Sequence, residues 1–149
     1  MFETILVPTD GSSHARQALD DAIGLAADQD ATLHVISVAD SGLLGSIRLP
    51  GEAARPREAI HDRAQQFVDD ALDRAEETGV DAVGSVLSGP PPSEILEYAR
   101  EIEADLIVMG SRGRGGFHRM AVGSVADHVI RFGEFRVLVV DADDGKPRV

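Results

Sequence analysis

Short apolar segments alternate with amphipathic segments along this chain of 149 residues, and this alternation restricts its fold more than any other feature. Five segments rich in β-branched and other apolar residues predict buried strands at Phe2–Val7, Thr32–Val38, Asp81–Ser88, Leu106–Met109 and Arg136–Val140. Four segments with helical spacing lie between them, at about residues 15–28, 57–78, 93–102 and 124–132. Strands that alternate with helices predict an α/β fold, a three-layer sandwich with helices on both faces of a five-stranded parallel sheet.

The ends of these segments follow from turn and capping residues. Pro8 is expected to end the first strand, and Gly84 to weaken the third. Gly133 is expected to end the fourth helix. Gly89 and the three prolines after it predict a rigid connector, after which Ser93 would cap the third helix.

The length suits a single domain, 1–149. In such sheets a ligand binds at the carboxyl ends of the strands, where the strand order changes direction. The loops Pro8–Ser13 and Gly110–Gly123 become neighbours there if the strand order is 3-2-1-4-5, which gives a Rossmann-like topology. Residues 39–56 predict a long surface loop, and residues 141–149 a frayed polar tail.

The charge balance is strongly acidic, with 26 Asp and Glu against 14 Lys and Arg and a net charge of −12. A surface of this sign repels nucleic acid and anionic membranes, so we expect neither as a partner. Lys146 is the single lysine. An acidic surface poor in lysine is typical of a halophilic organism with a salty cytoplasm, with simple solubility as the alternative.

Other absences narrow the functional classes. The chain has no cysteine, no run of 18 apolar residues and no signal-peptide pattern at its start. Disulfides, thiolate chemistry and a membrane span are therefore not expected. A cytoplasmic location is expected.

The segment from Gly110 to Ser124 concentrates glycine and positive charge. Four glycines lie within its first seven residues, and Arg112, Arg114 and Arg119 share the loop with them. It joins a predicted strand to a predicted helix. Unpaired backbone N–H groups and the helix dipole at such a place favour a phosphate group.

Three common phosphate motifs fail here on particular residues. A Walker A loop needs lysine and a hydroxyl residue where Gly116 and Phe117 stand. A dinucleotide-binding fingerprint needs a third glycine where His118 stands, and it belongs to the first turn of the sheet. A phosphoryl-accepting receiver needs an Asp near Ser88–Pro90 and a Lys near Asp141.

A fourth pattern is complete. Gly110, two residues, Gly113, nine residues, then Gly123 and Ser124 have the spacing of the ATP-binding branch of the universal stress protein family, which the chain resembles. The resemblance extends to Ile5–Ser12, Leu33–Ile36 and Val137–Val140, which are similar to the family's first turn and to two of its strands.

The resemblance implies a site for ATP or another adenine nucleotide, with Mg or Mn bound alongside it. Asp10 would lie near the ribose or the metal, Val35 against the adenine, and Ser124 near the phosphates. The full implied set is Pro8, Thr9, Asp10, Val35, Met109, Gly110, Arg112, Gly113, Gly123, Ser124 and Val125.

Each of these residues also has an ordinary structural reading. Asp10 could cap the first helix and Ser124 the fourth. Val35 and Met109 are core residues first, and the loop arginines could be solvated charges. His34 is better explained as a structural residue of a strand than as a catalytic one.

No nucleophile–base pair and no defined carboxylate pair is present, so we assign no catalytic residue. The resemblance then implies a nucleotide-dependent regulatory or stress-response module with a regulatory protein partner and at most slow ATP hydrolysis. The alternative is a nucleotide-independent dimeric scaffold or protective protein.

The last strand, Val137–Val140, would form an edge of the predicted sheet. An exposed apolar edge favours pairing with another chain. We therefore expect a homodimer through this strand, as the resemblance also implies.

Overall fold

The computed structural model describes residues 1–40, 56–112 and 122–142, and in these ranges strands and helices alternate as predicted. The strands are β1 (Thr4–Pro8), β2 (Thr32–Ala39), β3 (Ala82–Ser88), β4 (Leu106–Gly110) and β5 (Val137–Val140). The helices are α1 (Ser13–Gln29), α2 (Pro56–Thr78), α3 (Pro91–Glu101) and α4 (Ser124–Phe132). None of these helices is long and apolar enough to cross a membrane.

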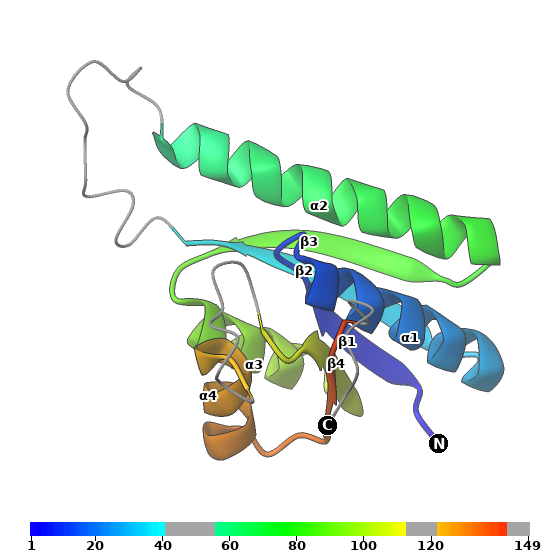
Figure 1. Cartoon of the computed structure of the whole chain (residues 1–149). Helices are drawn as coiled ribbons and strands as arrows, with labels where there is room; N and C mark the ends of the chain where they lie inside the picture. Colours follow the sequence, from blue (N-terminus) through cyan, green and yellow to red (C-terminus); the bar gives the residue numbers. More distant parts are fainter. Residues whose placement is uncertain (41–55, 113–121, 143–149) are drawn as a thin grey trace.

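The five strands form one sheet in the order β3-β2-β1-β4-β5, and every neighbouring pair is parallel. The predicted order 3-2-1-4-5 is thus confirmed. β1 lies in the middle of the sheet, between β2 and β4 (Figure 1). Leu6 is in register with His34 of β2 and with Ile107 of β4. The winding of the chain changes direction at this strand.

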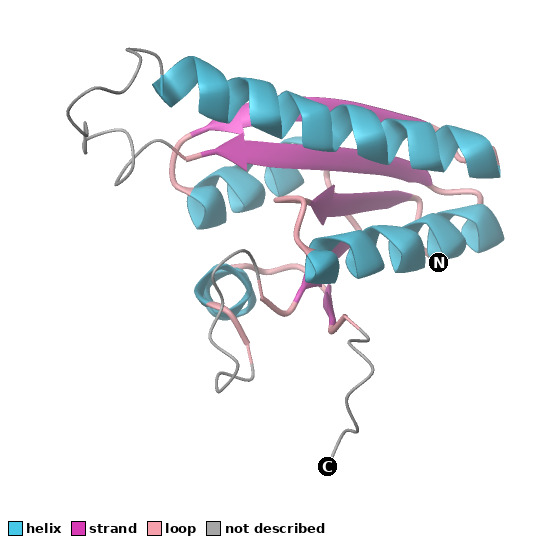
Figure 2. Cartoon of the chain, turned by 45° about the horizontal axis from the view of Figure 1, so that its top comes forward, coloured by secondary structure: helices cyan, strands magenta, loops and turns pink. Residues whose placement is uncertain are grey.

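Helices cover both faces of the sheet. Ile5 and Val7 of β1 belong to one buried cluster with residues of α1 and α2. Leu6 belongs to a second cluster with residues of α3 and α4. Figure 2 shows α1 and α2 along the same side of the sheet. Alternate side chains of each central strand therefore enter opposite layers, which explains why these strands are apolar throughout.

The third helix begins earlier than the sequence predicts. α3 starts at Pro91, with Pro90 as the N-cap residue, and the Ser93 hydroxyl donates to the Pro90 carbonyl at 3.1 Å. The prediction that Ser93 caps this helix, after a connector of three prolines, is wrong. Proline suits the first turn of a helix because its fixed φ is helical and no N–H is needed there.

Two other capping alternatives are also wrong. Ser12, not Asp10, caps α1, because its hydroxyl accepts the Ala15 N–H at 3.2 Å. Gly123 is the N-cap residue of α4, and Ser124 is its first helical residue. Sequence alone could not choose between adjacent candidates of similar capping strength.

Gly84 serves packing in β3. A β-carbon at this position would collide with side-chain carbons of Val68 and Leu72 on α2. The glycine therefore lets α2 lie close against the sheet, so its cost in strand propensity is offset by helix–sheet packing.

Asp105 joins the amino ends of β1 and β4. Its Oδ2 accepts the N–H groups of Glu3 at 2.8 Å and Thr4 at 2.9 Å, and its own N–H donates to the Thr4 carbonyl at 2.9 Å. The two backbone donors, followed by the nearby charge of Arg136, hold the pKa of Asp105 below its usual value.

We predict that Asp105→Ala lowers the free energy of unfolding at neutral pH by about 1 kcal/mol, because two backbone donors lose a charged acceptor. Since the folded pKa is depressed, the stabilisation is complete above the unfolded pKa of about 4 and is lost as pH falls through the lower folded pKa. Urea titrations of wild type, Asp105→Ala and the non-ionising Asp105→Asn from pH 7 to pH 2 measure this. A stability gap between wild type and Asp105→Asn that widens on acidification would contradict it.

Candidate functional site

Most of the predicted site residues that the structure describes lie at the carboxyl edge of the sheet, between β1 and β4. These two strands are neighbours, so the turn after Pro8 and the loop after Gly110 leave the sheet side by side. The strand order changes direction at this point, which is where α/β proteins of this class bind ligands.

The turn after β1 is fixed by its own polar groups. The Thr9 N–H donates to the Ile36 carbonyl of β2 at 2.8 Å, and the Thr9 hydroxyl accepts the Gly11 N–H at 3.2 Å. Asp10 Oδ1 accepts the Ser12 N–H at 2.9 Å. Asp10 is half-buried directly after the strand, so its carboxylate is positioned by the turn rather than by the helix cap.

Phe67 of α2 packs on the same turn, a contact that the sequence did not reveal. Gly11 has φ +75°, and a β-carbon there would collide with the Phe67 ring. Phe67 lies within the helix predicted at about residues 57–78, but helical spacing cannot say that its ring lies on this turn. Gly11 is thus required both by its left-handed backbone and by the close ring.

Gly110 has a packing role at the end of β4. A β-carbon on it would lie 2.8 Å from the carbonyl carbon of His14 and 3.0 Å from the Ala15 nitrogen. The first turn of α1 therefore rests directly on Gly110. Contact of this glycine with a nucleotide stays a prediction, because packing alone already explains the residue.

Val35 and Met109 are core residues in this structure. Val35 is 0% exposed and lies in the cluster beneath α1 and α2, whereas Met109 is 5% exposed and lies in the cluster beneath α3 and α4. The structural reading of both residues holds, and their predicted adenine and ribose contacts remain untested.

The base of the loop after β4 is closed by a backbone hydrogen bond. The Gly123 N–H donates to the Ser111 carbonyl at 2.5 Å. This donor therefore points at the start of the loop and is not directed to the open side of the site. Ser111, which lies between two predicted site residues, was not assigned a role from the sequence.

Unpaired donors occur on the residues next to Ser111 and Gly123 in the chain. The Arg112 Nε is buried and has no hydrogen-bond partner in the part of the chain that the structure describes. The first hydrogen bond of α4 runs from the Asp127 N–H to the Gly123 carbonyl at 2.9 Å. The N–H groups of Ser124, Val125 and Ala126 before it have no partner among the described residues. Donors from a guanidinium and a helix N-terminus favour an anion.

The predicted set is thus brought together in part. Pro8, Thr9 and Asp10 lie at one end of the site, and Gly110, Arg112, Gly123, Ser124 and Val125 at the other. Gly113, Arg114 and Arg119 lie outside the described residues.

His34 lies away from these groups. Its Nδ1 is 3.2 Å from the Tyr98 hydroxyl, and burial lowers its pKa. A neutral ring held by a neighbouring helix agrees with the structural reading of this residue.

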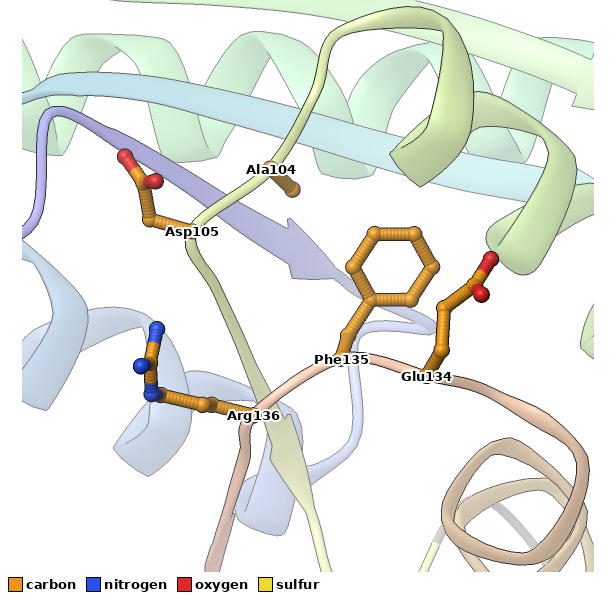
Figure 3. A pocket seen from close by; sticks show the side chains of 5 residues that line it. All are labelled: Ala104, Asp105, Glu134, Phe135 and Arg136. Atoms are coloured by element: carbon orange, nitrogen blue, oxygen red, sulfur yellow. The ribbon is translucent and has the colours of Figure 1, made fainter.

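Two hollows lie away from Arg112 and the N-terminus of α4. One of about 400 Å³ lies at the amino ends of β4 and β5, the opposite edge of the sheet, lined by Ala104, Asp105, Glu134, Phe135 and Arg136 (Figure 3). Another of about 360 Å³ lies where β2 and β3 end beneath the start of α2. It shares the carboxyl edge with the site but not its residues.

A resident metal centre has no support in the ranges 1–40, 56–112 and 122–142. No group of three His, Cys, Asp or Glu side chains there is arranged to hold a metal ion. Asp10 is the predicted acidic ligand, and a single carboxylate suits a cation that is also held by phosphate groups.

A five-stranded parallel sheet with this order, covered by helices on both faces, defines an α/β protein of Rossmann-like topology. The profile of the universal stress protein family matches residues 1–141. A universal stress protein of Methanocaldococcus jannaschii is 36% identical over 140 residues, which cover 94% of this chain and 82% of that protein. The chain belongs to the universal stress protein family.

Solved structures agree with this assignment. The universal stress protein UspA from Lactobacillus plantarum has a TM-score of 0.76 and 28% identity, with 93% of this chain and 97% of that chain covered. A universal stress protein crystallised in complex with cAMP has a TM-score of 0.72 and 27% identity, with 95% and 99% covered. Adenine-nucleotide binding therefore occurs among proteins of this fold and family.

Proposed function

We propose that this chain is a nucleotide-binding regulatory module that takes ATP or another adenine nucleotide at the carboxyl edge between β1 and β4. The observation that carries the proposal is the buried Arg112 Nε, which has no partner among the described residues and belongs to the residue after Ser111, whose carbonyl is bonded to Gly123 at the start of α4. These donors suit a phosphate chain, because a guanidinium and a helix N-terminus both favour an anion. The structural neighbour that holds cAMP supports an adenine nucleotide.

The residues would divide the ligand between two ends of the site. Arg112 and the first turn of α4 would bind phosphates, and Asp10 would lie toward the ribose or a Mg or Mn ion carried with the nucleotide. The metal would neutralise phosphate charge. Because no catalytic residue is assigned, the role is regulatory toward a protein partner, with hydrolysis slow at most.

We predict that Arg112→Ala weakens ATP-Mg binding about tenfold or more, because a charge-assisted contact to phosphate is lost. Calorimetry on nucleotide-stripped protein at fixed ionic strength measures this. Arg100→Ala is the matched control, since it removes the same charge from α3, where Arg100 forms an exposed ion pair with Glu134. Wild type that binds no ATP below millimolar concentration would reject the proposal and favour a nucleotide-independent scaffold.

The homodimer is proposed through β5, which pairs with β4 alone among the described strands. The carbonyls of Arg136 and Val140 accept N–H groups of Ile107 and Ser111 from the β4 side. By alternation, Val137 and Val139 direct their backbone groups to the open side. Leu138 is 39% exposed on this strand, so an apolar edge with unpaired backbone groups is available to a second copy.

We predict that wild type has a dimer mass by light scattering at micromolar concentration, and that Val139→Pro has a monomer mass. Proline removes an outward N–H while leaving the β4 ladder intact. Circular dichroism of the variant checks that it is folded. A monomer mass for wild type would overturn the dimer.

The acidic surface supports a cytoplasmic role at high salt. The net charge of −12 produces self-repulsion that salt screens, and exposed carboxylates follow one another along α2, among them Asp69, Asp70 and Asp73. We predict that the melting temperature rises from low to molar KCl. Calorimetric scans in a KCl series measure this, and a flat or falling series would contradict it.

A further inference from the structure

Ser111 is hydrogen-bonded through its N–H, its carbonyl and its hydroxyl. It is 2% exposed. Its N–H donates to the Val140 carbonyl at the end of β5, at 2.8 Å, and its carbonyl accepts the Gly123 N–H at 2.5 Å. Its backbone therefore joins β5 to the start of α4.

The Ser111 side chain belongs to a polar group drawn from three distant parts of the chain. Its hydroxyl donates to Oδ1 of Asp141, and its oxygen lies 3.4 Å from Nδ1 of His14. The same His14 nitrogen accepts the Ala142 N–H at 2.9 Å. We call Ser111, His14 and Asp141 the Ser111 cluster.

The Ser111 cluster contains the residue types of a catalytic triad but not its arrangement. In a triad, histidine lies between serine and aspartate and takes the serine proton. Here the serine lies between the other two and directs its proton to Asp141, while the His14 Nδ1 lone pair is taken by a backbone N–H. With a buried hydroxyl and a base already engaged, the Ser111 cluster is suited to holding position rather than to nucleophilic attack.

The position of Ser111 is important because the two elements proposed to bind phosphate, Arg112 and the first turn of α4, are both attached to it. Arg112 follows it directly, and Gly123, which precedes the first turn of α4, is bonded to its carbonyl. The orientation of the Ser111 peptide thus sets where the guanidinium starts and where the helix N–H groups point. Asp141 and His14 fix that orientation from the side chain, and Val140 fixes it from the backbone.

We propose that Ser111, held by Asp141 and His14, is a positioning residue that aligns Arg112 with the N-terminus of α4 for the phosphate groups of a nucleotide. The proposal rests on the proposed nucleotide function. It assigns the phosphate end of the ligand, not its adenosine end, to control by the Ser111 cluster.

The test compares ATP-Mg with adenosine, which lacks phosphates, on folded wild type and Ser111→Ala. We expect Ser111→Ala to weaken ATP binding about tenfold and to leave adenosine binding within about twofold of wild type. Asp141→Ala should behave like Ser111→Ala. Asp141→Asn should retain ATP affinity, because its amide oxygen can still accept the hydroxyl proton. Equal loss for both ligands, or no loss for ATP, would overturn the positioning role.

A second measurement needs no ligand and separates this proposal from the first. Amide hydrogen exchange of Gly123 reports directly on its bond to the Ser111 carbonyl. We expect this amide to exchange at least about tenfold faster in Ser111→Ala than in wild type, with Asp141→Asn close to wild type. Unchanged exchange would refute the Ser111 cluster. Faster exchange in a protein that binds no ATP would refute only the nucleotide function.

Discussion

The parallel pairing of β1 with β4 is the interaction on which the remaining structure depends. Ile5 pairs with Leu106 and Leu6 with Ile107, and all four side chains are buried. Because β2 occupies the other side of β1, this pairing is where the winding of the sheet reverses. It brings a turn near the start of the chain beside a loop about a hundred residues later. The arrangement of the site is thus a consequence of sheet order.

The close packing of α1 and α2 on the sheet further shapes the site that the pairing of β1 with β4 creates. There is no room for a β-carbon at three glycine positions. The Phe67 ring fills the space at position 11, side chains of α2 fill it at position 84, and the α1 backbone fills it at position 110. Two of these three contacts lie at the candidate site. Small residues therefore set how near α1 and α2 come to it, and the same packing that stabilises the fold shapes the surface a ligand would meet.

The sequence predicted the elements and the strand order, because alternating periodic segments and the spaced glycine pattern restrict both. It failed where the decision was between neighbours, as at Pro90 against Ser93 and at Ser12 against Asp10. It could not find the Ser111 cluster, whose members are separated by 97 and 30 residues. Such contacts follow from tertiary packing, and no local spacing records them.

The hydrogen bond between Ser111 and Gly123 has a consequence for how this family can diversify. Ser111 is bonded to the end of β5 through its N–H and to Gly123 through its carbonyl. A shift of the N-terminus of α4 would therefore pull on the edge strand of the sheet, so variation at either place is constrained by the other.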